Sequence, residues 1–242
     1  MSPSPSTRVY LVRHCDVENP GRVLYGHLDG FRLSEKGVRQ AHALGERLAS
    51  TPVRQIYSSP LERAQQTARI IASHLDNVPV TITPELTEAR FGRYLQGVRA
   101  NINIIWRRPL WDVQMLWPGI LPNDESVAEM ARRVRAPLLR LVRDHPGQGG
   151  ICVSHGDPIQ ALWVESEGRG PWALHRLQCA KGGMLELDYD GEPRCTEHAV
   201  AGATEPMYRL VGGGRLVWIS RGQLDPDSPL RCAVCDALIG AG

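Results

Sequence analysis

The chain has 242 residues and carries 28 lysines and arginines against 26 aspartates and glutamates, a formal net charge of +2. This length suits one large domain, and so small a net charge argues against a nucleic acid as the partner. No apolar run is long enough to cross a bilayer, so no membrane partner is expected. Residues 1–7 are polar and rich in proline and serine, which predicts a disordered lead-in and a cytoplasmic protein.

A strand and a helix are the first elements that the sequence predicts. Residues 9–12 form a short apolar, β-prone run that ends in Arg13 and His14. Further along the chain, Ser34 is suited to cap a helix, because its hydroxyl can accept a hydrogen bond from the first turn. The helical period then gives this helix one buried face, made of Val38, Ala41, Leu44 and Leu48.

A second helix is predicted to begin at a capping box of Ser59 and Glu62, with Pro60 at its first helical position. Arg63 then falls in the first turn, where unpaired backbone N–H groups already favour an anion. This helix start is expected to help bind phosphate. The buried stripe that follows consists of Ala64, Ala68, Ile71 and Leu75.

The second half of the chain repeats this alternation. A helix is predicted over residues 124–144, with a kink at Pro137. A strand over residues 151–153 ends in Ser154, His155 and Gly156, and another helix is predicted over residues 158–163. Later strands are predicted at residues 184–189 and 216–219. The inward face of the long helix is expected to hold Val127, Met130, Val134, Leu138 and Leu141.

Helices that alternate with strands indicate a three-layer α/β/α sandwich with a mostly parallel central sheet. We assign this domain to residues 8–200. Residues 92–122 fit no clear period and are rich in tryptophan, arginine and proline, so they are interpreted as an insertion over the site. Residues 201–242 are interpreted as a C-terminal extension.

Two histidines each follow the end of a predicted strand. His14 follows residues 9–12, and His155 follows residues 151–153. Because the carboxyl ends of parallel strands form the ligand crevice of an α/β sheet, both imidazoles are expected at one edge. With Arg13 beside them, they would make an anion site that contains a nucleophile.

Five segments of this chain, in order, resemble the histidine phosphatase superfamily, which includes the cofactor-dependent phosphoglycerate mutases. The resemblance covers roughly residues 8 to 190. The matching segments are Leu11 to His14, Leu33 to Gly37 with Gln40 and Ala41, Ser58 to Ala68, Glu88 to Gly97, and Val153 to Gly156.

The resemblance implies a catalytic role for several of these residues. His14 would attack phosphorus and carry the phosphoryl group, while Arg13, Arg63 and His155 hold the phosphate oxygens. Glu88 would be the general acid that protonates the leaving oxygen. Asp157 is a rival for that role, and Glu85 and Glu125 are weaker candidates.

Further residues are expected near the substrate. The resemblance implies a phosphate contact from Asn19 and places Gly156 in the binding site. Arg22 and His27 border the expected pocket, although surface exposure is the interpretation we favour for both. Within the insertion, an aromatic and basic lid is expected from Trp106, Arg107, Arg108, Trp111 and Trp117.

Cys15 departs from the family pattern, which has glycine after the motif histidine. A cysteine fits there if the local φ is negative, although activity could be lower. A His-Cys pair also opens the signature of cysteine-dependent phosphatases, but that signature needs arginine at position 21, which is Gly21. Asp16 and Glu18 would also repel a phosphate, so we reject that mechanism.

The remaining cysteines are expected to be free thiols in a reducing cytoplasm. A structural zinc site is a weaker alternative, and it would use Cys195, His198, Cys232 and Cys235. No cofactor is expected.

Together, these features predict a metal-independent phosphomonoester hydrolase that acts through a phosphohistidine on a small phosphorylated metabolite. Two alternatives stay open: phosphotransfer of the phosphoglycerate mutase type, and a degenerate phosphate-binding protein with little turnover because of Cys15. Only about thirty residues separate Gly97 from the long helix, and so short an insertion favours hydrolysis. The expected partner is the small phosphorylated substrate, and a homodimer is left open.

Overall fold

The computed structural model describes residues 7–90, 96–99, 125–166, 169–174, 179–189, 194–199 and 206–211. Its strands are β1 (Thr7–Arg13), β2 (Val53–Ser58), β3 (Val80–Ile82), β4 (Gly149–Ser154), β5 (Met184–Tyr189), β6 (Arg194–Ala199) and β7 (Pro206–Val211). Its α-helices are α1 (Glu35–Leu48), α2 (Glu62–Ser73), α4 (Val127–Asp144) and α5 (Gly156–Ser166), with short 3₁₀ turns η1 (Pro84–Leu86) and η2 (Pro171–Ala173).

The strands form one sheet in the order β3-β2-β4-β1-β5-β7-β6. The first four strands of this order are mutually parallel, while β5 is antiparallel to β1. The carboxyl ends of β1, β2 and β4 therefore meet at one edge. This arrangement confirms the predicted α/β sandwich with a mostly parallel sheet.

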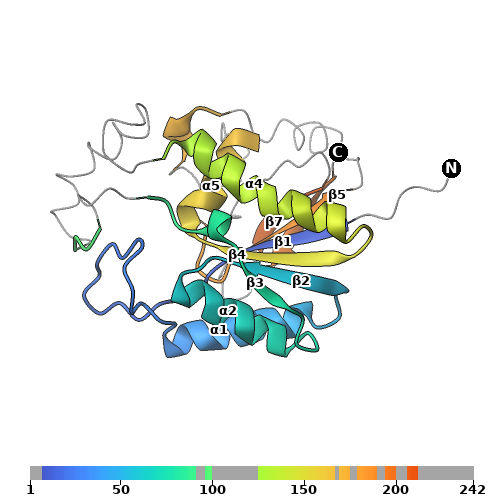
Figure 1. Ribbon diagram of the computed structural model, residues 1–242, viewed down its shortest axis with the longest axis horizontal. Coiled ribbons are helices and arrows are strands. Elements are labelled where there is room, and N and C mark those ends of the chain that lie inside the picture. Colours follow the sequence, from blue (N-terminus) through green and yellow to red (C-terminus); the bar gives the residue numbers. More distant parts are fainter. Residues whose placement is uncertain are drawn as a thin grey trace.

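Helices cover both faces of the sheet (Figure 1). The helices α1 and α2 lie on one face, and α4 and α5 lie on the other. Because successive side chains of a strand point to opposite faces, β1 contributes to both layers. Val9 and Leu11 pack with α4 and α5, whereas Tyr10 and Val12 pack with α1 and α2.

The predicted cap of α1 is confirmed, since Ser34 Oγ accepts a hydrogen bond from the Gly37 N–H at 3.0 Å. The predicted inward position of Val38 is wrong: this side chain is exposed, and Gly37 and Gln40 are buried in its place. The reason is steric, because Gly37 lies against the backbone of Asp16. A β-carbon at Gly37 would come within 2.0 Å of the Asp16 carbonyl oxygen.

The capping box predicted at Ser59 is also wrong. The helix α2 begins at Glu62, and its N-cap residue Leu61 makes no side-chain capping bond. The Ser59 hydroxyl instead accepts a hydrogen bond from the Leu61 N–H at 3.3 Å and contacts His155. Arg63 still lies in the first turn, as predicted.

The predictions for the second half hold with shifted ends. The helix α4 has all five expected apolar residues buried, and it begins at Val127 behind a capping box of Ser126 and Glu129. Pro137 lies inside this helix and is buried. The helix α5 starts two residues earlier than predicted, at Gly156, and β5 has the predicted bounds.

The sheet also contains residues that we had assigned to the lead-in and to the C-terminal extension. Thr7, predicted to close the lead-in, is buried and begins β1. The strand β7 was not predicted: it lies in the expected extension and pairs with β5. Residues 1–6 and the strand predicted at residues 216–219 lie outside the described residues.

Candidate active site

The two histidines meet because β1 and β4 are neighbours in the sheet. Arg13 pairs in register with Ser154, so His14 and His155 follow at the same edge. The His14 N–H donates to the Ser154 carbonyl at 2.9 Å, and the two imidazole centroids lie 5.0 Å apart. Both side chains are fully buried.

The hydrogen bond of His14 identifies its tautomer. Its Nδ1 lies 2.8 Å from the carbonyl oxygen of Cys15, and since a carbonyl only accepts, Nδ1 must carry the proton. The other nitrogen, Nε2, then has a free lone pair. Burial, together with the charges of Arg63 and Arg13, holds the pKa of His14 well below its usual value. The ring is therefore a neutral imidazole with a nucleophilic Nε2.

Arg63 brings a positive charge beside His155. Its Nη2 donates to the Gly26 carbonyl at 2.8 Å and to Nδ1 of His155 at 3.2 Å. Because Nδ1 accepts, the proton of His155 is on Nε2, which donates to Ser59 Oγ at 2.7 Å. Burial, Arg63 and His14 lower the pKa of His155 as well, so this ring is also neutral.

Arg13 reaches the same cluster from the end of β1. Its Nη1 donates to the carbonyl of Cys179. The guanidinium lies over Gly156 so closely that a β-carbon there would sit 3.1 Å from Cζ. Gly156 therefore leaves room for Arg13 at the start of α5, and its role as a binding residue stays a prediction.

Three buried nitrogens of this cluster have no hydrogen-bond partner: His14 Nε2, Arg13 Nε and Arg63 Nε. Across the described residues only one other buried side-chain nitrogen or oxygen, Nε1 of Trp163, shares this property. A buried polar atom without a partner is costly. Two unpaired cationic donors beside one unpaired lone pair fit a ligand that offers anionic oxygens around an electrophilic atom.

Glu88 places a carboxyl group next to His155, with 3.7 Å between Oε2 and Nδ1. Its Oε1 accepts the Ala89 N–H at 2.9 Å. Burial and the neighbouring Asp157 raise the pKa of Glu88, although Arg63 opposes the shift. Burial also raises the pKa of Asp157, which lies in the first turn of α5. Both carboxyls are thus biased toward the protonated form that a general acid needs.

Tyr25 lies in the loop that the resemblance places at the border of the pocket, and it forms one wall of the cluster through stacking contacts that the sequence did not predict. Its ring lies under the Arg63 guanidinium, 4.6 Å from Cζ, and stacks on Phe31 with centroids 4.9 Å apart. The ring also meets His14 edge-on at 6.4 Å. An arginine that stacks on an aromatic ring keeps its edge free for a ligand.

The structure places Asn19 in a turn. Its side-chain amide donates to the Val23 carbonyl at 2.9 Å and accepts the Val23 N–H at 3.1 Å. Both polar ends of the amide are thus occupied by backbone, and the phosphate contact expected of Asn19 stays a prediction. Arg22 is exposed and has a φ of 47°, in the left-handed region.

His27, for which we favoured surface exposure, is half-buried and makes contacts with the backbone. Its Nε2 lies 2.9 Å from the carbonyl oxygen of Glu88 and 3.1 Å from that of Ala89. His27 therefore binds the backbone of the segment that carries the candidate acid.

The thiol of Cys15 faces away from the cluster. The residue is fully buried in the core between the sheet and the helices α1 and α2, and its φ is not positive. Its N–H donates to Thr67 Oγ1 at 3.1 Å. Burial raises the pKa of the thiol to about 12, so a thiolate is disfavoured. This geometry supports our rejection of a cysteine mechanism.

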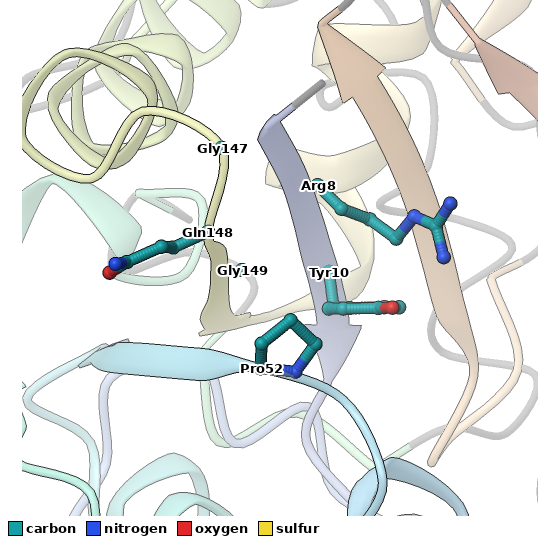
Figure 2. Close-up of a pocket in the computed structure, with 6 residues that line it drawn as sticks. All are labelled: Arg8, Tyr10, Pro52, Gly147, Gln148 and Gly149. Carbon is teal, nitrogen blue, oxygen red and sulfur yellow. The ribbon is translucent and has the colours of Figure 1, made fainter. Parts of the chain in front are cut away.

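A pocket of about 250 Å³ lies at the opposite edge of the sheet (Figure 2). It is bordered by the first residues of β1 and β4 and by the residue before β2, whereas the histidines follow the last residues of β1 and β4. The pocket is thus separate from the histidine cluster. Its lining consists of Arg8, Tyr10, Pro52, Gly147, Gln148 and Gly149.

Several predicted residues lie where the structure gives no side chains. The lid residues Trp106, Arg107, Arg108, Trp111 and Trp117 fall outside the described residues, as do Cys232 and Cys235. Cys195 and His198 lie in β6, whose side chains are not described, so the zinc site stays a prediction. Among the described helices, none is long and apolar enough to span a membrane.

Comparison with known sequences agrees with this geometry. The sequence model of the histidine phosphatase superfamily (branch 1) matches residues 9–199 of this chain. The chain belongs to the histidine phosphatase superfamily. The matched range includes every residue of the cluster described above.

Relatives of this member of the superfamily match most of its length. An uncharacterized protein of Mycobacterium tuberculosis is 34% identical over 188 residues, which cover 77% of this chain and 92% of that protein. A probable phosphoglycerate mutase of Yersinia enterocolitica is 33% identical over 190 residues, covering 77% and 86%. Among solved structures, a mycobacterial glucosyl-3-phosphoglycerate phosphatase aligns with a TM-score of 0.64 at 26% identity, covering 77% and 92%.

Proposed function

We propose that this protein hydrolyses phosphomonoesters without a metal ion, through a phosphohistidine on His14. One observation carries the proposal: the unpaired Nε2 lone pair of His14 lies in a buried cluster with the unpaired Nε donors of Arg13 and Arg63. A phosphoryl group would supply an electrophilic phosphorus to the lone pair and anionic oxygens to the two donors. The two guanidinium groups provide the positive charge that stabilises the transition state.

In the first step, Nε2 of His14 forms a bond to phosphorus as the bond from phosphorus to the leaving oxygen breaks. Glu88 gives its proton to that oxygen, so the product leaves as an alcohol. The hydrogen bond from Nδ1 to the Cys15 carbonyl stabilises the positive charge that the ring gains.

In the second step, water attacks phosphorus and the bond to Nε2 breaks. The carboxylate of Glu88 accepts a proton from this water, and inorganic phosphate is released. His14 returns to its neutral form, and Glu88 is protonated again for the next turnover.

We propose a small phosphorylated metabolite as the substrate and the cytoplasm as the site of action. The relative described as a probable phosphoglycerate mutase keeps transfer as a second candidate. In that case the phosphohistidine would pass its phosphoryl group to another hydroxyl instead of water. The buried position of Cys15 argues against a disabled binding protein, because its thiol takes no space from the cluster.

The test is phosphate release from p-nitrophenyl phosphate in the presence of EDTA, for the wild type, His14→Ala and Cys15→Gly. We expect turnover in the wild type and in Cys15→Gly, and none in His14→Ala. Turnover that survives in His14→Ala would refute the phosphohistidine, and loss of activity with EDTA would refute the metal-independent route.

A panel of phosphorylated metabolites labelled in the phosphoryl group separates hydrolysis from transfer. Hydrolysis releases the label as free phosphate, whereas a mutase moves it to another carbon of the substrate. Activity that appears only in Cys15→Gly would instead identify the natural protein as a disabled phosphatase.

A further inference from the structure

Arg133 of α4 lies against the backbone of the segment that ends in Glu88. Its Nη1 donates to the carbonyls of Glu85 at 2.8 Å and Thr87 at 2.6 Å. Its Nη2 donates to the carbonyl of Glu88 itself at 3.2 Å. These three carbonyls belong to η1 and the residues just after it, so one side chain fixes the direction in which the chain leaves this turn.

Glu125 holds the guanidinium of Arg133 in place. One carboxylate oxygen accepts a hydrogen bond from Nε at 2.7 Å, and the other accepts one from Nη2 at 2.6 Å. This is the bidentate geometry that arginine forms with a carboxylate. With these bonds, all five N–H donors of Arg133 are used. Glu125 also accepts the Arg90 N–H at 3.2 Å, so it binds the chain on the far side of Glu88.

The Glu88 carbonyl receives a second donor from another part of the chain, the Nε2 of His27 at 2.9 Å. The segment from Glu85 to Arg90 is therefore held by side chains from both α4 and the loop after β1. Both members of the Arg133–Glu125 pair are largely buried, with side-chain exposures of 18% and 8%. A buried ion pair gives little net stability by itself. The contribution of this pair therefore lies in the backbone segment that it holds in place.

We propose that Arg133, together with Glu125, positions Glu88 for proton transfer to the leaving group. The inference rests on the proposed function, in which Glu88 is the general acid. Proton transfer requires the carboxyl within hydrogen-bond reach of the leaving oxygen, and a displacement of about 1 Å can cost roughly a hundredfold in rate. Arg133 binds the backbone of Glu88 itself. Removing the Arg133 side chain would therefore displace the Glu88 carboxyl without changing His14.

The readout is the dependence of kcat/KM on the leaving group, because kcat/KM reports only the steps up to formation of the phosphohistidine, whereas kcat also includes the water step in which Glu88 acts as a base. A general acid matters most when the leaving oxygen is basic, and little when it departs as a stable anion such as p-nitrophenolate. A series of phenyl phosphates with substituents from nitro to methoxy gives leaving phenols of increasing pKa. The slope of log(kcat/KM) against that pKa measures how much the enzyme assists the leaving group. We would compare the wild type with Arg133→Gln, Glu125→Gln and Glu88→Gln.

Arg135→Gln is the matched control, because it makes the same change on α4. It breaks an ion pair with Glu165 of α5, with 2.7 Å between Nη2 and Oε2, and Glu165 is not part of the Glu88 segment. We expect Arg133→Gln and Glu125→Gln to lose roughly tenfold to a hundredfold in kcat/KM on the methoxy compound and less than about threefold on the nitro compound. Arg135→Gln should keep the wild-type slope.

Equal losses on every compound, with an unchanged slope, would show that Arg133 serves only the fold. If Arg133→Gln does not fold, Arg133→Lys decides, since lysine keeps the charge but lacks the fork that reaches three carbonyls. A steeper slope in Arg133→Lys supports positioning, and a wild-type slope overturns it.

Glu88→Gln separates the two hypotheses. If it leaves the slope unchanged, the acid is another group and the proposed role of Glu88 fails, whatever Arg133 does. If its slope steepens and that of Arg133→Gln does not, the acid is confirmed and the positioning role is overturned. Wild-type protein that turns over neither the aryl phosphates nor any member of the metabolite panel would refute the proposed function and this inference with it.

Discussion

At the scale of single residues, the cluster depends on groups that carry no charge of their own. Gly156 leaves room for the Arg13 guanidinium, and the Cys15 carbonyl fixes the tautomer of His14. Ser59 binds His155 through its hydroxyl. Each of these contacts aims a charged or nucleophilic group without contributing a charge.

Replacing Gly156 by alanine should weaken phosphate binding. The new β-carbon would lie 3.1 Å from Arg13 Cζ and push the guanidinium away from its position. Loss of one charge-assisted hydrogen bond predicts a rise in KM for p-nitrophenyl phosphate of roughly tenfold or more. Gly21→Ala is the matched control, because its β-carbon would meet Val23 at an ordinary 3.6 Å. An unchanged KM in Gly156→Ala would show that Arg13 does not bind substrate from this position.

The pKa shifts predict the shape of the pH profile. The pKa of His14 lies well below 6.5, so the nucleophile stays neutral as the pH falls through mildly acidic values. Glu88 must be protonated, and its pKa is raised to about 7, so the acid is lost as the pH rises above that value. For a substrate with a basic leaving group, kcat/KM should therefore fall on the alkaline side with an apparent pKa near 7. In Glu88→Gln this alkaline decline should disappear, and a decline that persists would assign it to another group.

At the scale of elements, α1 is held close to the loop after β1 through Gly37. The helical period predicted Val38 on the buried face, because periodicity counts apolar side chains and gives glycine no weight. The actual contact is between the helix and the Asp16 backbone, which is distant in sequence. No local pattern reports such an approach.

Gly37→Ala should therefore destabilise the protein, although alanine favours a helix. Its β-carbon would meet a backbone oxygen at 2.0 Å, and overpacking of this kind costs about 1–3 kcal/mol. Gly45→Ala in the same helix meets the side chain of His74, which can rotate, so its cost should be smaller. Urea unfolding of both variants checks the order, and an equal or larger loss in Gly45→Ala would contradict it.

At the scale of the whole molecule, phosphate should bind residues from three separate elements and so stabilise the fold. Inorganic phosphate at a hundred times its Kd would add roughly 2.7 kcal/mol, equivalent to a rise in Tm of about 5–10 °C for a chain of this size. Arg13→Gln should lose most of this rise. Arg8→Gln lies on the same strand at the opposite edge and should keep it. An equal rise in both variants would place the bound phosphate elsewhere.

Much of the fold was predictable because strands and helices alternate and each has a clear apolar pattern. The edge that carries His14, Arg63 and His155 followed from strand ends and one helix start. Arg133 and the contacts made by Tyr25 and His27 were missed, since each depends on residues far away in sequence. In the sequence, nothing distinguishes Arg133 from the other arginines of α4. Its role depends on contacts with the turn at η1, which the sequence of the helix does not report.

The sheet order has a consequence for synthesis of the chain. The strand β4 lies between β1 and β2 in the sheet, but it is made about ninety residues after β2. Within the described residues, the partners of β1 are β4 and β5, and neither exists before residue 149. A nascent chain that ends earlier can pair β2 with β3 but has no strand to place beside β1. His14 thus emerges from the ribosome early and acquires its surroundings only when the centre of the sheet is inserted.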